Sequence, residues 1–413
     1  MTRLALSSHV LLLALALGLT GCFTVQRPAD YYRPRRTTLA ADRVELPTTS
    51  LDEYLLIETR INGAGPFRLL VDSGCSSLVL SPRAAKLAHV RANPFLTEYV
   101  SVIGGKGLVK QSTAQVDRLE AGGLTLEGVK ALVSGKTAWA EELIIHQMAF
   151  GEVESFDGVL GMSVLYDVIL EMDYPTRQVA VVRPGTGQLP ADRAVPYNLD
   201  IGVGWVTLEI GGKPVRALID TGFNGGFKIT SWEDIPLLYP QQKEDGLGAY
   251  GAGGQVRRRA WGQLEGEMRL GPITWQNAIG VSNDGKEAVV GSLALKPWKV
   301  VFDQHAHQLY LLGEHALVAL KKVPAPDVRF KPGYFCELHG DGIRLLEVDA
   351  GGTFEQAGLR VGDVISTVDG FKAVDWVAAR VPSEVLKKPS VKLNVERDGK
   401  RFETTLVQGP DAP

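Results

Sequence analysis

One stretch of this chain occurs twice. Residues 66–74 read PFRLLVDSG and residues 214–222 read PVRALIDTG, and the two stretches align without a gap. Pro, Arg, Leu, Asp and Gly fall at the same five places, while Val exchanges with Ile and Ser with Thr. Agreement of this quality is improbable by chance, and self-similarity at a long spacing is typical of a duplicated structural unit. The chain should therefore contain two related halves.

Later segments extend the repeat. Two Gly-rich segments, 103–107 and 250–254, follow the repeated stretch at almost the same offset. The apolar segments 158–162 and 288–292 also match, as do the strand-turn-strand patterns of 168–181 and 299–311. These later pairs are closer together in the chain, which indicates that the second copy lacks a segment of the first. We expect the halves to span residues 46–185 and 195–315.

Composition defines the class of protein. The chain has 413 residues, 45% hydrophobic and 22% charged, with 46 Gly and 3 Cys. This length predicts two or three domains, and the composition excludes a disordered chain, a disulfide scaffold and a multispanning membrane protein. A net charge of -3 gives no broad basic surface, so we expect no nucleic-acid partner. Short β-branched segments bounded by Gly, Pro, Asn or Asp predict a mainly β fold, with one short helix near 81–90.

The chemistry lies at two aspartates. Asp72 and Asp220 each end an apolar strand, and a hydroxyl residue and a glycine follow each of them. An acidic side chain on a buried strand is costly unless something uses it. If the two halves face one another, the two carboxylates lie close together and cannot both ionise, so they share one proton. One then serves as general base for water and the other as general acid, which suits hydrolysis of a peptide bond.

At these residues the sequence resembles the aspartic peptidases, and most closely the retropepsin-like branch, duplicated in one chain. The resemblance covers about residues 46–315. It implies an acid-protease fold built from a pseudo-two-fold pair of β-barrel halves, with Asp72 and Asp220 catalytic. The supporting residues would be Ser73, Gly74, Thr221 and Gly222, with the two hydroxyls hydrogen-bonded across the pseudo-dyad. Cys75 and Phe223 stand where pepsin-like enzymes usually carry Ser or Thr, which favours the retropepsin comparison.

The resemblance also implies flaps and packing elements. The flaps would close over an extended polypeptide substrate and contain Gly104, Gly105, Gly107, Gly251, Gly253 and Gly254. Residues 159–161 and 289–291 would pack beside the catalytic loops. Two structural turns, or a decayed site that only binds peptides, remain as alternatives to a catalytic pair.

A different pattern begins after three prolines, Pro324, Pro326 and Pro332. Residues 341–370 contain an Ala-Gly-Leu element followed by Gly-Asp-Val-Ile and then by Asp-Gly, in that order. This order resembles a bacterial PDZ domain, here spanning 328–408, although a generic small β domain is the alternative. The resemblance implies a groove for a C-terminal or internal peptide, added as a strand. Its carboxylate-binding loop would be Gly333, Tyr334 and Phe335.

The N-terminus carries a targeting pattern. Arg3 precedes an apolar stretch at 10–19, which has the length of a signal-peptide core. Leu19, Thr20, Gly21 and Cys22 resemble the bacterial lipobox, which implies a signal peptide over 1–21 and lipidation of Cys22. Residues 22–45 would form a tether holding the protein in the bacterial cell envelope, at the outer membrane facing the periplasm. An uncleaved anchor or a plain secretory signal is the alternative.

Several other features favour ordinary structural roles. Residues 246–251 fit GxGxxG but precede no convincing crossover helix, so we interpret them as a loop or flap. His305 and His307 align with a hairpin turn of the first half, so no metal site is expected with His315, and no cofactor is implied. Cys75 and Cys336 should be packed thiols, and Trp275 and Trp298 should lie in the core.

Together these patterns predict a lipid-anchored aspartic endopeptidase that cleaves envelope proteins or peptides, with a PDZ module that recruits substrates or regulates the enzyme. A non-catalytic peptide-binding scaffold that retains the protease fold is the rival hypothesis. A peptidase dedicated to one partner is a third possibility, because it would look inert on generic substrates.

Overall fold

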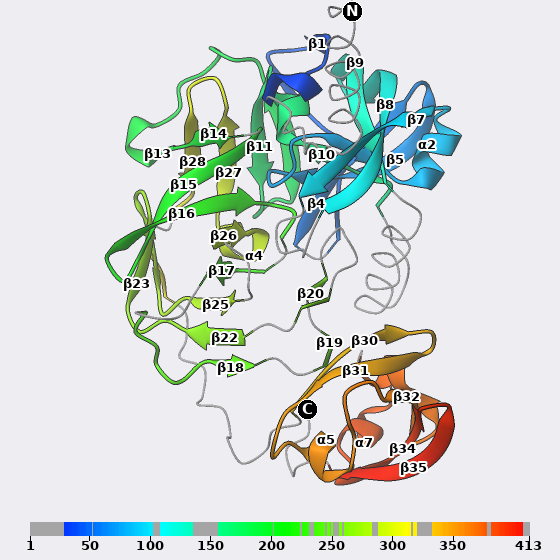
Figure 1. Ribbon diagram of the computed structural model, residues 1–413. Coiled ribbons are helices and arrows are strands. Elements are labelled where there is room, and N and C mark those ends of the chain that lie inside the picture. The colour runs from blue at the N-terminus through cyan, green and yellow to red at the C-terminus, as the bar shows by residue number, and fades with distance from the viewer. Residues whose placement is uncertain are drawn as a thin grey trace, which may run out of the picture.

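The computed structural model describes residues 29–407 apart from 52, 102–107, 135–155, 201, 224, 231–234, 244–245, 248, 251–255, 258–259, 283–287, 315–316, 320–332 and 378–380. Strands dominate this part of the chain, as the sequence predicts (Figure 1).

The first half contains a closed barrel of six strands. They are β4 (Tyr54–Ile61), β5 (Ala64–Asp72), β6 (Leu78–Leu80), β8 (Leu108–Ala121), β9 (Leu124–Val133) and β10 (Gly158–Gly161). Their order is β9-β6-β10-β5-β4-β8, and β8 pairs with β9 to close the ring. Three more strands extend this sheet: β1 (Arg36–Leu39), β3 (Thr48–Leu51) and β7 (Ala92–Ser101). The short helix α2 (Pro82–Leu87) begins where the sequence predicts it, because the Ser81 Oγ accepts a hydrogen bond from the Ala84 N–H at 3.0 Å.

The second half forms an eleven-stranded sheet. Its members are β14 (Asn198–Asp200), β15 (Val203–Ile210), β16 (Lys213–Asp220), β17 (Phe227–Ile229), β18 (Gln242–Lys243), β22 (Ala260–Gln263), β23 (Glu267–Leu270), β24 (Ile273–Gln276), β25 (Ile279–Ser282), β26 (Ala288–Gly291) and β29 (Leu317–Ala319). Its central order, β17-β26-β16-β15, corresponds to β6-β10-β5-β4 of the first half. The short strands β20 (Ala249–Tyr250) and β21 (Val256–Arg257) pair with each other.

A six-stranded sheet joins the two halves. Its order is β13 (Ala194–Pro196), β28 (Gln308–Leu312), β27 (Lys299–Asp303), β11 (Ile169–Asp173), β12 (Gln178–Val182) and β2 (Arg43–Glu45). Three short helical turns lie near these strands in the chain: η2 (Met162–Leu165) before β11, η3 (Ala191–Arg193) before β13, and α4 (Ser292–Leu295) before β27. One apolar core runs through both halves, and Trp275 and Trp298 lie fully buried in it, as expected.

The expected tether is wrong for residues 29–45. This segment forms η1 (Ala29–Tyr32), and its strands β1 and β2 pair with β9 and β12. The Tyr32 hydroxyl donates a hydrogen bond to Glu98, and the Arg33 Nη2 lies 2.5 Å from the Asp167 Oδ1. The segment shows no apolar periodicity because its short edge strands pair through main-chain hydrogen bonds, while the segment buries single side chains such as Tyr32 and Val44. Within the described residues, no helix is long and apolar enough to cross a membrane.

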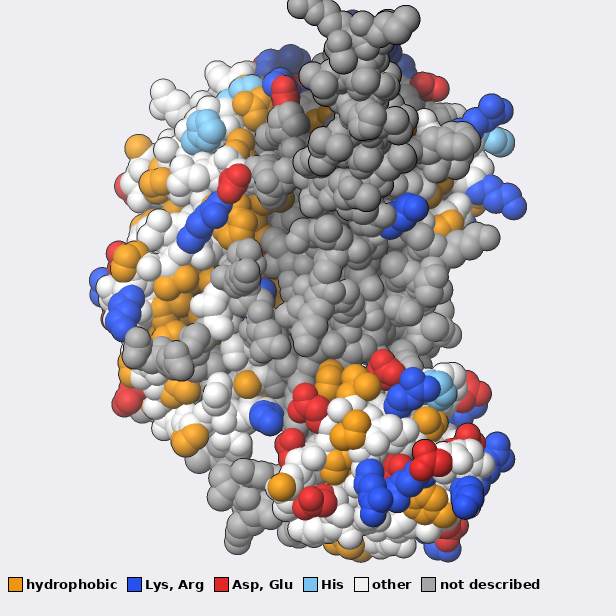
Figure 2. Space-filling view, in the orientation of Figure 1, with side chains coloured by type: hydrophobic (Ala, Val, Ile, Leu, Met, Phe, Trp, Pro, Cys, Tyr) orange, Lys and Arg blue, Asp and Glu red, His pale blue; other side chains and the backbone are white. Residues whose placement is uncertain are grey.

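The C-terminal unit, residues 333–407, has its own core. Its strands are β30 (Tyr334–His339), β31 (Gly342–Val348), β32 (Val364–Val368), β33 (Phe371–Lys372), β34 (Ser390–Arg397) and β35 (Lys400–Val407). Three short helices complete it: α5 (Thr353–Gln356), α6 (Ala373–Val377) and α7 (Ser383–Leu386). The unit lies at the bottom of Figure 1, and its surface mixes acidic and basic side chains (Figure 2). A two-residue strand of the second half, β19 (Gly246–Leu247), pairs with its edge strand β30.

Candidate active site

Asp72 and Asp220 are the last residues of β5 and β16. Each strand runs parallel to a neighbour that ends in glycine, so that Asp72 pairs with Gly161 and Asp220 with Gly291. Val71 and Ile219 point into the main core. Side chains alternate along a strand, so Asp72 lies on the same face as Leu70, and Asp220 lies on the same face as Leu218. Leu70 and Leu218 each pack in a smaller apolar cluster outside the main core.

The two carboxyl groups meet. They are hydrogen-bonded to each other, and each also accepts a hydrogen bond from the glycine of its own loop. The Gly74 N–H lies 2.7 Å from the Asp72 Oδ1, and the Gly222 N–H lies 2.9 Å from the Asp220 Oδ1. A Cβ atom at Gly74 would lie 2.6 Å from the Asp220 Cγ, and one at Gly222 would lie 2.5 Å from the Asp72 Cγ. Only glycine lets each carboxyl sit against the opposite loop.

Ser73 and Thr221 hold the two loops together through four reciprocal hydrogen bonds. The Ser73 Oγ donates to the Ile219 carbonyl at 2.7 Å and accepts from the Thr221 N–H at 3.0 Å. The Thr221 Oγ1 donates to the Val71 carbonyl at 2.8 Å and accepts from the Ser73 N–H at 2.9 Å. Both hydroxyl residues are buried, so these bonds fix the ends of β5 and β16 relative to each other.

Burial and mutual repulsion set the ionisation of the pair. Burial raises the pKa of Asp72, while the hydrogen bond from the Gly74 N–H opposes the shift. Burial raises the pKa of Asp220 well above its usual range, and the negative charge of Asp72 adds to the effect. Two carboxyl groups in one buried site favour the state that carries one proton between them.

The neighbouring titratable groups stay neutral. Burial, followed by the charge of Asp72, raises the pKa of the Cys75 thiol to about 12. Burial and the charges of Asp220 and Asp72 raise the pKa of Tyr174 as well. Cys75 and Cys336 are free thiols. A nucleophilic thiolate at Cys75 is therefore disfavoured.

The apolar-apolar-Gly elements pack beside the two loops. The Gly161 N–H donates to the Ser77 carbonyl at 3.0 Å, and the Gly291 N–H donates to the Gly226 carbonyl at 2.8 Å. A Cβ atom at Gly161 would lie 2.6 Å from the Ser77 oxygen, which leaves room only for glycine.

The other predicted site residues fall into two groups. Cys22 and the flap residues Gly104, Gly105, Gly107, Gly251, Gly253 and Gly254 lie outside the described residues. Gly333, Tyr334 and Phe335 belong to the C-terminal unit, where Gly333 has a positive φ of 68° and directly precedes β30. The structure therefore places them in a unit separate from the aspartate pair.

The motifs assigned ordinary roles fall in turns and short strands. His305 and His307 are exposed in the turn between β27 and β28, and His315 lies outside the described residues. No cluster of three His, Cys, Asp or Glu side chains in the described part of the chain could hold a metal ion. The GxGxxG segment contributes β19 and β20.

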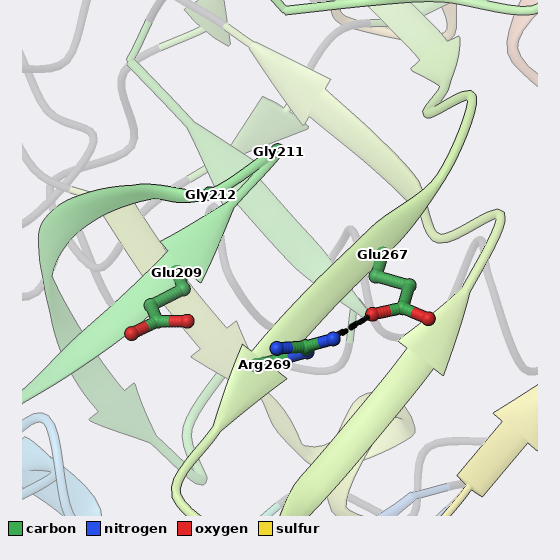
Figure 3. Close-up of a pocket in the computed structure, with 5 residues that line it drawn as sticks. All are labelled: Glu209, Gly211, Gly212, Glu267 and Arg269. Atoms are coloured by element: carbon green, nitrogen blue, oxygen red, sulfur yellow. Dashed lines mark hydrogen bonds and ion pairs between the residues drawn. The ribbon is translucent and has the colours of Figure 1, made fainter.

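The pocket in Figure 3 lies away from the aspartates. Its lining residues are Glu209, Gly211, Gly212, Glu267 and Arg269. The glycines form the turn before β16, whereas Asp220 ends that strand, so strand length separates the two places by about 25 Å. Arg269 is already paired with Glu267, with the Nε atom 2.9 Å from the Oε2 atom.

Sequence reasoning missed Lys228, which lies on β17 and is 6% exposed. Its positive charge opposes the rise in the pKa of Asp220. The signal was a lysine between Phe227 and Ile229 in an otherwise apolar strand.

A closed six-stranded barrel with a hydrogen-bonded aspartate pair at two strand ends supports an aspartic-type peptidase in general. Comparison with known families agrees, because residues 57–164 match the aspartyl protease family model. The match includes Asp72 and Gly161 but ends before Asp220. No curated protein matched the chain. The family match and the barrel support a retropepsin-like aspartyl protease.

Proposed function

We propose that the protein is an aspartic endopeptidase whose catalytic residues are Asp72 and Asp220. The observation that carries this proposal is the seating of each carboxyl against the glycine of the opposite loop, which brings the two carboxyls into hydrogen-bonding contact. Water bound between them is the nucleophile. The ionised carboxylate takes a proton from this water, and the water oxygen attacks the carbonyl carbon of the peptide bond.

The protonated partner completes the step. It donates its proton to the carbonyl oxygen, so that a neutral tetrahedral diol forms and the pair again carries one proton. The diol collapses when its C–N bond breaks, one diol hydroxyl loses a proton to the ionised carboxylate, and the leaving nitrogen receives a proton from the other carboxyl. No charge builds up on the substrate that the site would have to stabilise separately.

The test is cleavage of an unfolded polypeptide such as casein by the full chain. Asp72→Asn and Asp220→Asn should each abolish cleavage, because either change removes the ability to exchange the shared proton. Asp192→Asn is a matched control, since Asp192 is 81% exposed in η3 and should keep full activity. Circular dichroism confirms that each variant is folded. Full activity in either dyad variant would contradict the assignment.

We further propose that 195–315 is a second copy of 46–185 and that the two form a pseudo-two-fold pair. The shared central strand order and the matching Asp–Gly registers support this. Flap closure by the Gly-rich segments 103–107 and 250–254 belongs to the same proposal.

The C-terminal unit is proposed to be a PDZ domain that receives a peptide at β30. Supporting features are the place of β30 on the outer side of the unit's own sheet, where β19 of the second half already adds as a parallel strand, and the sharp turn at Gly333 before it. Binding of a fluorescent peptide to the Asp72→Asn full chain, compared with the same peptide amidated at its C-terminus, tests whether a terminal carboxylate is recognised. Equal binding of the two would contradict carboxylate recognition.

Attachment to the bacterial envelope through Cys22 is proposed from the lipobox resemblance alone. Mass spectrometry of the mature N-terminus and fractionation of a Cys22→Ala variant test it. If no cleavage occurs from acid to neutral pH while peptides bind tightly, the non-catalytic scaffold replaces the enzyme.

A further inference from the structure

A row of paired residues crosses the second sheet one step below Asp220. Trp205 pairs with Leu218, Leu218 with Val289, and Val289 with Lys228. The first half has the same row, composed of Leu56, Leu70, Val159 and Val79. Seven of these eight positions are apolar. Lys228 therefore stands where the first half carries Val79.

Lys228 lies on the same face as the aspartate. Its neighbours in sequence, Phe227 and Ile229, both point into the main core. Side chains alternate along a strand, so Lys228 points to the opposite face. The apolar cluster that contains Leu218 and Val289 covers that face, and Asp220 also lies there.

The geometry brings the lysine within reach of the aspartate pair. Asp220 is two residues beyond Leu218, about 7 Å along the strand, and β17 is two strands away, about 10 Å across the sheet. The Cα atoms are then about 12 Å apart, a distance that the lysine and aspartate side chains together largely span.

The groups near Asp220 differ in the sign of their charge. Asp72 faces it from β5 and carries the competing negative charge. Cys75, in the loop that follows Asp72, and Tyr174, directly after β11, have raised pKa values and stay neutral. Lys228 from β17 contributes the positive charge. A buried ammonium group is costly unless negative charge compensates it, and Asp220 carries negative charge that interacts with Lys228.

We propose that Lys228 is a positioning residue that stabilises the single negative charge of the Asp72–Asp220 pair and so sets the pH range in which the pair holds one proton. This inference rests on the proposed peptidase function. Without the ammonium group, both ionisations of the pair need a higher pH, because an opposite charge nearby favours the ionised form.

The first experiment compares pH profiles of kcat/KM for the full chain. Lys228→Met should move both limbs of the profile to higher pH by about one unit. Lys228→Arg, which keeps the charge, should leave both limbs within about 0.3 unit of the original. Val79→Met, at the matched position of the first half, should leave them unchanged. A folded fraction that is constant with pH scales the whole profile without moving its limbs, so a constant loss of folded protein does not mimic the shift.

A charge moved to the other half gives a second test. Val79→Lys should shift both limbs to lower pH, because a second cation then faces the pair from β6. Unchanged limbs in Lys228→Met, or limbs that move to lower pH, would overturn the inference, and so would unchanged limbs in a folded Val79→Lys variant.

An infrared titration separates this inference from the proposed function. The band of protonated carboxyl groups that disappears in Asp220→Asn reports the pair without any substrate. If the wild-type protein cleaves nothing but this band titrates at higher pH in Lys228→Met, the peptidase proposal fails and the role of Lys228 stands. If cleavage occurs and the band titrates identically in both proteins, the role of Lys228 is wrong.

Discussion

The hydrogen bonds between the two aspartate loops give the sharpest energetic prediction. Thr221→Val removes the Oγ1 atom and keeps the size and branching of the side chain. The Ser73 N–H and the Val71 carbonyl then lose their partner, and both residues are completely buried. Water cannot replace the hydroxyl there without opening the contact between the loops.

The size of the stability loss follows from these two groups that lose their hydrogen-bond partner. Each buried polar group left without a partner costs about 1–3 kcal/mol, so Thr221→Val should lower the free energy of unfolding by about 2–6 kcal/mol. Ser73→Ala leaves the Ile219 carbonyl and the Thr221 N–H without a hydrogen-bond partner, so it should lower the free energy of unfolding by a similar amount. A domain with a free energy of unfolding of about 10 kcal/mol, in the middle of the ordinary range, still folds after such a loss.

Activity should fall as well, because Asp220 directly precedes Thr221. A displacement of about 1 Å at a reacting group can cost about 10²-fold in rate, so we expect kcat to fall by that order.

Urea unfolding measures the stability change, and cleavage of a fluorogenic peptide measures kcat. Thr207→Val is the control, because Thr207 is exposed on β15 and should change the free energy of unfolding by less than about 0.5 kcal/mol. If Thr221→Val unfolds like this control and keeps its kcat, the four hydrogen bonds do not hold the site together.

Three further predictions concern the aspartate pair and the C-terminal unit. Burial raises the pKa of Asp220 in the fold, so the stability it contributes is complete below its ordinary pKa of 3.8 and is lost as the pH rises through the folded value. Asp220→Asn should therefore gain stability relative to the wild type as the pH rises above about 4. Urea unfolding of both proteins at pH 4 and at pH 7 measures this, and an equal difference in free energy of unfolding at the two pH values would contradict it. Gly74→Ala should abolish cleavage, because its Cβ would lie 2.6 Å from the Asp220 Cγ, and a crystal structure with an undisturbed Asp220 would refute that reason. Arg397→Met should destabilise the C-terminal unit by about 3–5 kcal/mol, since the Asp363 carboxylate is buried and held by two Arg397 nitrogens at 2.6 and 2.7 Å. Calorimetry should then show an earlier unfolding step while cleavage of a short peptide persists, and a single unchanged transition would contradict it.

Much of the site was predictable because it depends on local sequence. An apolar strand that ends in Asp, a hydroxyl residue and Gly is visible without structure, and its recurrence suggested that Asp72 and Asp220 meet. The helix after Ser81 followed from a capping residue and Pro82 at the first turn.

The structure corrected the interpretation of residues 29–45. Polar side chains and prolines indicate an extended tether, but β1 and β2 are held by main-chain hydrogen bonds to β9 and β12. Any residue except proline can make such bonds, so side-chain patterns reveal little about edge strands.

The sequence by itself determined the mainly β fold, the two aspartates and the hydroxyl and glycine residues beside them, because each depends on residues close together in the chain. Only the tertiary structure decided which distant groups act on the aspartates. Lys228 affects the pair because β17, β26 and β16 lie side by side in one register. Electrostatic energy depends on the distance between charges in space and on their burial, and the order of residues in the chain specifies neither directly.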